Sequence, residues 1–156
     1  MSVSKKLQQV LTQVQKAVSG TLAGEVLVEA QVAVVQNVET VVYGRYTPEM
    51  YERRGDNGGL SDMGNVVGTM VSPTHLQVTN ITPPNPVNGT TDKDLTATVE
   101  EGLTYNYDYY DPGNRRHGYW ASPRPFMAHA ADELREDGRV KDALVAGLRA
   151  QGYDAH

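Results

Sequence analysis

The stretch that decides the fold is Tyr119-Trp120-Ala121-Ser122-Pro123-Arg124-Pro125-Phe126-Met127. It contains the only tryptophan and the only phenylalanine of the chain, and it holds one arginine between two prolines. Proline has no backbone N–H and suits the first turn of a helix, where that donor has no partner within the helix. We therefore interpret the stretch as the junction between a β part of the chain and a helical part that starts near Pro125.

Two short helices are expected after this junction. Apolar residues recur every four positions in both segments, at Phe126, Ala130 and Leu134 and then at Val140, Leu144 and Leu148. This spacing predicts one apolar stripe on each helix. Glu136-Asp137-Gly138 is expected to end the first helix and Gly152 the second, because glycine commonly follows the last helical residue.

The N-terminal third of the chain is also expected to be helical. Between residues 7 and 18 the apolar residues share one helical face, at Leu7, Val10, Leu11, Val14, Ala17 and Val18. The valine-rich segment from Leu22 to Tyr43 fits both a strand and a helix, and we favour a long helix. Its polar strip is narrow, so it is either a central core helix or a helix shared with a neighbouring subunit. A break is expected at Tyr43 to Pro48.

The middle of the chain predicts a small sheet. Asn65 to Val71 and Leu76 to Thr82 are rich in valine and threonine and are separated by Ser72-Pro73-Thr74-His75, which predicts a β-hairpin. A glycine-rich connector is expected at Arg54 to Gly59, and a short helix at Leu95 to Glu101 that ends at Gly102.

These elements define an α+β fold with a long N-terminal helix, a small antiparallel sheet with a hairpin, and C-terminal helices. At 156 residues the chain is expected to form a single domain over residues 1–156. Its N-terminal helical part is expected at 3–43, its β part at 60–121 and its C-terminal helical part at 125–151.

Composition disfavours several functions. The formal net charge of −5 gives no basic field for binding nucleic acid, and the lack of cysteine excludes disulfides and thiolate chemistry. No run of about 18 apolar residues is present, so no membrane partner is expected.

No catalytic or metal-binding pattern is found in the sequence. His129 shares a helical face with Asp132 and Glu133, which favours a solvated ion pair over a metal site. The segment from Asp92 resembles the start of a calcium loop, but Ala97 stands where glycine is needed. We therefore expect no enzyme activity, no cofactor and no metal.

Three segments carry a resemblance to a known family: Arg54-Gly55 with Leu60, the Glu101-Gly102 step, and Pro123-Arg124-Pro125-Phe126 with Ala130. In this order the chain resembles the small neck or tail-completion proteins of long-tailed bacteriophages, which join the DNA-filled head to the tail. The resemblance implies an α+β protein assembled as a homo-oligomeric ring around the DNA channel. It also implies partners in the phage connector or stopper and the tail terminator or tail tube, and a place in the virion after assembly in the host cytoplasm. DNA would pass through the ring without sequence-specific binding.

Six residues are candidates for subunit interfaces, because arginine and large aromatic residues dominate interface energies. They are Tyr51, Arg53, Tyr107, Trp120, Arg124 and Phe126. Arg124 is expected to extend away from its two prolines, as a fixed contact to the rest of the domain or to the next subunit. Two alternatives stay open: a minor capsid or tail-tube component, and a small carbohydrate- or peptide-binding module that uses Tyr105 to Tyr110 and Trp120 for stacking.

Overall fold

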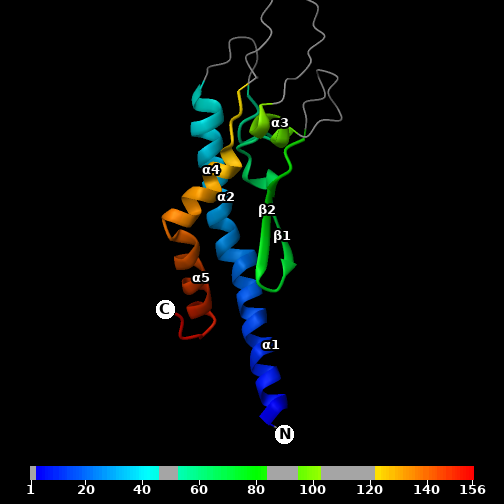
Figure 1. The fold of residues 1–156 in the computed structure, drawn as a ribbon, viewed down its shortest axis with the longest axis vertical. Helices are drawn as coiled ribbons and strands as arrows, with labels where there is room; N and C mark the ends of the chain where they lie inside the picture. The colour runs from blue at the N-terminus through cyan, green and yellow to red at the C-terminus, as the bar shows by residue number, and fades with distance from the viewer. Residues whose placement is uncertain (1–2, 46–52, 84–94, 103–121) are drawn as a thin grey trace, which may run out of the picture. The chain divides into compact units, whose positions relative to one another are not determined.

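The computed structural model describes residues 3–45, 53–83, 95–102 and 122–156. In these residues the protein is α+β, with a long N-terminal helix, a two-stranded antiparallel sheet and C-terminal helices (Figure 1). The expected fold class is therefore confirmed. Several expected elements lie outside the described residues, among them the tyrosine-rich segment from Tyr105 to Tyr110.

The N-terminal helix continues without interruption from Val3 to Arg45. It consists of α1 (Val3–Thr21), a π-helical turn (Leu22–Val26), α2 (Leu27–Asn37), a second π-helical turn (Val38–Val42) and a 3-10 turn (Tyr43–Arg45). Residues 22–43 are thus helical, as favoured from the sequence. Their buried side chains recur at helical spacing, at Val26, Ala30, Ala33, Val34, Val38 and Val42. This burial favours the core-helix reading of the segment.

The chain divides into two compact units. The first comprises Met1–Ala33, Val67–Thr79 and Ala131–His156, and the second comprises Val34–Val66 and Asn80–Ala130. Each unit contains buried apolar side chains. Ala17 and Val26 are buried in the first unit, while Val38, Leu60 and Phe126 are buried in the second.

In the first unit, helix α5 (Arg139–Ala150) packs against α1 through a glycine. A Cβ atom added to Gly147 would lie 2.4 Å from Cγ2 of Thr21, so the two backbones approach closely. Just after the end of α5, Gln151 Nε2 donates to Thr21 Oγ1 at 2.8 Å and to the carbonyl of Ala17 at 3.3 Å. Because later residues of α5 meet earlier residues of α1, the two helices are antiparallel.

The predicted hairpin is confirmed. Strand β1 (Val66–Ser72) pairs with β2 (His75–Asn80) across a turn at Pro73 and Thr74. In the first unit, a Cβ atom at Gly68 would lie 2.7 Å from Cδ1 of Leu27, so the hairpin rests on the long helix at a residue without a side chain.

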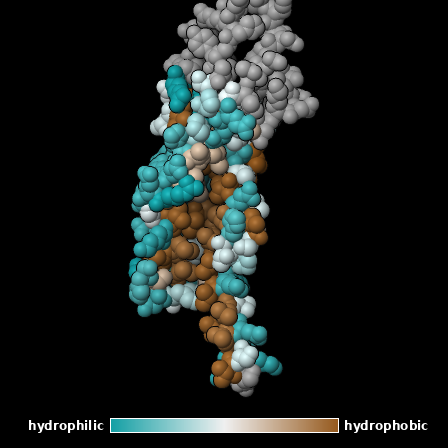
Figure 2. Space-filling view, in the orientation of Figure 1, coloured by the Kyte–Doolittle hydropathy of each residue, from teal (hydrophilic) through white to brown (hydrophobic). Residues whose placement is uncertain are grey.

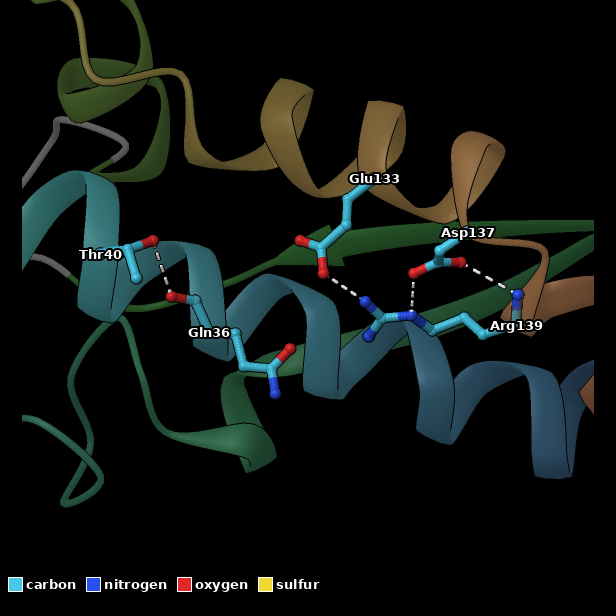
Figure 3. A network of polar contacts seen from close by, with 5 residues as sticks. All are labelled: Gln36, Thr40, Glu133, Asp137 and Arg139. Atoms are coloured by element: carbon cyan, nitrogen blue, oxygen red, sulfur yellow. Dashed lines mark hydrogen bonds and ion pairs between the residues drawn. The ribbon is translucent and has the colours of Figure 1, made fainter.

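Both C-terminal helices are confirmed within one or two residues. Helix α4 (Phe126–Glu136) begins just after Pro125, whose carbonyl accepts a hydrogen bond from His129 N at 2.9 Å. Gly138 separates α4 from α5 at φ 75°, a left-handed conformation that favours glycine. Arg139 then pairs with both Glu133 and Asp137 (Figure 3). In the second unit, Thr40 Oγ1 donates to the carbonyl of Gln36 at 3.0 Å, also drawn there.

Candidate interaction surface

The clearest surface feature of the first unit is an apolar stripe on α1. Val3 is 84% exposed and Val14 is 38% exposed, and all residues from 3 to 16 are exposed. We define the N-terminal stripe as Val3, Leu7, Val10 and Val14, with Leu11 beside it. Figure 2 shows apolar side chains gathered along this end of the helix. Exposure of these apolar side chains to water is unfavourable for an isolated chain.

The spacing of the stripe is that of a heptad repeat. Starting at Val3, the positions on the stripe follow steps of four, three, four, three and four residues, through Leu7, Val10, Val14, Ala17 and Thr21. This 3.5-residue period produces the narrow seam by which one helix packs along another.

Helix α5 covers this seam from Ala17 onward. Ala17 is 4% exposed and Thr21 is fully buried, against Gly147 and Gln151. Helix α5 ends at Ala150, and Gly152 at φ 87° turns the chain. The residues of the seam before Ala17 are left open in the described part of the chain.

The charge of α1 differs from that of the remainder. The helix carries Lys5, Lys6 and Lys16 and no acidic residue, a formal +3. Since the whole chain has a net charge of −5, the residues outside α1 sum to −8. The stripe therefore lies on a basic helix of an otherwise acidic protein.

In the second unit, two of the motif segments singled out in the sequence meet. Arg124 N donates to the carbonyl of Val99 at 3.0 Å, and Met127 N donates to the carboxylate of Glu100. A Cβ atom at Gly102 would lie 2.5 Å from Pro123 N, and Gly102 has φ 67°. Helix α3 (Leu95–Glu101) and the start of α4 are thus joined by main-chain contacts that require a glycine.

Glu100 occupies the N-terminal end of α4 in the same unit. Burial raises the pKa of its carboxyl, while hydrogen bonds from the N–H groups of Met127 and Ala128 and the charge of His129 oppose the shift. A carboxylate at this end of a helix also interacts favourably with the helix dipole.

The third motif segment, the loop after Arg53, is held by buried amide and hydroxyl groups. Asn80 Nδ2 donates to the carbonyl of Leu60 at 2.9 Å, and Thr82 Oγ1 donates to the carbonyl of Gly59 at 3.1 Å. Thr96 Oγ1 donates to the carbonyl of Asn80 at 2.9 Å, which connects α3 to the end of β2. All three motif segments therefore make contacts within the second unit, where Leu60, Arg124, Phe126 and Ala130 are buried.

The structure places three of the six predicted interface residues. Arg124 is 7% exposed and Phe126 is fully buried, so Arg124 does not extend into solvent and both side chains face the protein interior. Arg53 is half-buried, and its guanidinium carbon lies 4.7 Å from the ring centroid of Tyr43. Tyr51, Tyr107 and Trp120 lie outside the described residues. The interface roles of all six remain predictions.

The open stripe was missed as a site, although all of its residues except Val3 were assigned to one helical face. Periodicity identifies which residues share a face, but it does not tell whether another element covers them. The exposed face also lies before residue 17, whereas the sequence suggested a shared helix between residues 22 and 43.

The expected absences of a metal, a membrane partner, an enzymatic activity and a cofactor remain predictions. Among the described residues, no group of three or more histidine or acidic side chains can hold a metal ion. The 43-residue helix Val3–Arg45 is long and apolar enough to cross a membrane by length and composition alone, a property that core helices and signal sequences share. The absence of an enzymatic activity, a cofactor or a membrane partner is not established by these findings.

The fold and the surface together define an α+β protein with a basic amphipathic N-terminal helix that is open for association. The chain belongs to the YomN family, whose model matches residues 5–150. It is 32% identical over 111 residues to the SPbeta prophage-derived uncharacterized protein YomN of Bacillus subtilis (strain 168), which covers 71% of this chain and 67% of that protein. None of the solved structures matches the chain.

These comparisons agree with the expected phage origin at the level of the family, which includes a prophage-derived relative. The matching family is YomN, however, and not a neck or tail-completion family. The specific resemblance inferred from the three motif segments is therefore not supported. Two of those segments meet, and the third is held by hydrogen bonds from Asn80 and Thr82, so the structure accounts for them as parts of the fold of the second unit.

Proposed function

We propose that this protein is a structural component of a phage particle, located at the head–tail junction. In this proposal it forms a homo-oligomeric ring around the DNA channel and joins the connector or stopper to the tail terminator or tail tube. One observation carries the proposal: the apolar N-terminal stripe is exposed in the single chain. Covering a Leu or Val side chain stabilises an assembly by about 1.5–3 kcal/mol each, so the stripe favours a protein that works in contact with others.

The charge distribution supports the same role. The residues outside α1 sum to −8, and an acidic lumen would repel DNA phosphates and let DNA pass without binding. A ring with a basic lumen would contradict this part of the proposal. The protein acts here by assembly, without catalysis, cofactor or membrane.

The test is particle assembly in a phage that encodes this chain. Deleting its gene should give DNA-filled heads and separate, complete tails in electron micrographs of lysates. The protein should also co-purify with intact particles. Its absence from purified particles, or normal particles without it, would refute a virion role.

The same deletion separates the alternatives within the virion. Defective heads would indicate a minor capsid protein, and tails of altered length or none at all would indicate a tail-tube component. A complementing chain with Leu7→Gln and Val10→Gln should restore assembly poorly. The matched control, Gln8→Ala with Gln15→Ala on the polar face of α1, should restore it fully.

A further inference from the structure

We infer that the N-terminal stripe is covered by the same stripe of a second copy of this chain, with the two α1 helices antiparallel. This deepens the proposed function by naming what covers the stripe. The pairing itself is a property of the isolated protein. Only the role of the pair in particle assembly rests on the proposed function.

The spacing indicates that the occupant is a helix. A stripe with a 3.5-residue period stays in contact only with a helix that coils around it. A helix that lies on a membrane surface presents a broader apolar face, commonly with Trp or Phe. In α1 the apolar residues are those at the heptad positions together with Leu11 and Val18, and no aromatic residue is present.

In an antiparallel pair, every stripe residue of one copy faces a stripe residue of the other. If Leu7 and Val14 are a positions of the heptad, then Val3 and Val10 are d positions. Antiparallel helices place a positions opposite d positions. Leu7 then faces the partner's Val10, and Val14 faces the partner's Val3. A two-fold axis between residues 8 and 9 generates every layer with apolar residues on both sides.

Charge favours the antiparallel direction. In a parallel pair Lys5 and Lys6 of both copies would lie at the same level, where like charges repel. In the antiparallel register these lysines lie level with the partner's Thr12 and Leu11, which are uncharged. The two helix dipoles are also opposed in this arrangement, which is favourable.

The pair continues packing that already exists in the chain. Helix α5 runs antiparallel to α1 and covers the seam at Thr21 and Ala17, then ends at Ala150. The open part from Val14 to Val3 spans eleven residue steps, or about 16 Å of helix. The partner's α1 would extend the same seam in the same direction as α5.

This contact is distinct from the proposed ring. A two-fold contact uses the same patch on both copies and cannot propagate around a cyclic ring. Ring contacts therefore require other surfaces, and the stripe contributes to the proposed assembly by joining subunits in pairs.

Sedimentation equilibrium of the full chain tests the pair. The wild-type protein should be a dimer, and Leu7→Gln with Val10→Gln should raise its dissociation constant by at least ~100-fold, since each copy loses two apolar layers. Gln8→Ala with Gln15→Ala should leave the constant unchanged. Both side chains of the first variant are exposed in the single chain, so circular dichroism should show unchanged helix content. A wild-type monomer at all soluble concentrations would refute the inference.

Cysteine cross-linking tests whether the two helices are antiparallel. The chain has no cysteine, so only the introduced cysteines can form disulfides. A mixture of Val3→Cys and Val14→Cys chains should form a mixed disulfide dimer under mild oxidation, far more than either chain alone. Efficient cross-linking of Val3→Cys with itself would show a parallel pair and overturn the register.

Three further outcomes separate the pair from a membrane partner and from the proposed function. A monomeric wild-type chain that binds vesicles of phosphatidylcholine and phosphatidylglycerol, and loses this with Leu7→Gln and Val10→Gln, would assign the stripe to a membrane surface. Particles that contain the protein although it is monomeric would overturn the pair but keep the proposed function. A dimer that never enters particles would support the pair but overturn the proposed function.

Discussion

Substituting Gly147 by alanine should destabilise the first unit, although alanine is the better helix former. A Cβ atom at this position would lie 2.4 Å from Thr21 Cγ2 and 3.0 Å from Thr21 Oγ1. Thr21 is fully buried, and its hydroxyl accepts a hydrogen bond from Gln151 Nε2 at 2.8 Å. Thr21 therefore cannot rotate away without breaking that bond, so α5 must move outward instead.

Three effects set the magnitude. Overpacking of a filled interface costs about 1–3 kcal/mol, and a weakened hydrogen bond costs about 1 kcal/mol. The higher helix propensity of alanine offsets about 1 kcal/mol of this. The net loss of unfolding free energy should be about 1–3 kcal/mol, or a Tm lower by roughly 2–12 °C in a chain of this size.

Thermal and urea unfolding followed by circular dichroism measure this loss. Gly20→Ala is the matched control, because Gly20 lies in α1 with nothing within 4 Å of its added Cβ atom. It should stabilise the protein by up to about 1 kcal/mol. The double variant Gly147→Ala with Thr21→Ser removes the nearest methyl group and should recover much of the loss. Stabilisation by Gly147→Ala equal to that of Gly20→Ala would refute the close packing of α5 on α1.

Three predictions concern the second unit. Gly102→Ala should destabilise the protein by at least about 2 kcal/mol in urea unfolding, because its Cβ atom would lie 2.5 Å from Pro123 N at a φ of 67°; unchanged stability would contradict the contact. Burial raises the pKa of Glu100, so the folded chain holds this proton more tightly and stability should fall as pH rises through the raised pKa. Glu100→Gln should flatten that part of a plot of Tm against pH, and an identical profile would show that Glu100 does not contribute. Arg124→Ala should lower Tm because the side chain is buried, while the folded variant should enter particles as well as the unchanged chain does. An unchanged Tm with reduced incorporation would make Arg124 an interface residue.

The sequence was sufficient for features that depend on neighbouring residues. The valine periodicity from Val26 to Val42 favoured a long helix over a strand, and the buried positions of the structure recur at helical spacing. Glycines also marked helix ends correctly at Gly102 and Gly138, where the backbone adopts positive φ.

The remaining features depend on contacts between distant residues. Arg124 was expected to make a fixed contact either to the rest of the domain or to the next subunit; its side chain is buried, and its backbone N–H bonds to the carbonyl of Val99. Nothing local to Pro123 or Pro125 encodes a contact with α3. The open stripe also depends on a distant contact, because α5 covers Ala17 and Thr21 but not Val14. The apolar periodicity is the same in the covered and the open part, so it could not predict where the covered part ends.

The π-helical turn from Leu22 to Val26 has a consequence for how this helix can change in evolution. A π turn holds one residue more than an α turn, so it acts as a built-in single-residue insertion. Removing one residue there would restore an ordinary turn and rotate everything before it by roughly 100° about the helix axis. In the first unit, Ala17 and Thr21 would then turn away from α5 while Leu27 kept its place under Gly68. The extra residue therefore sets the angle about the helix axis between the face that packs against α5 and the face that packs against the hairpin. Relatives that lack it should show changed residues at both of these contacts.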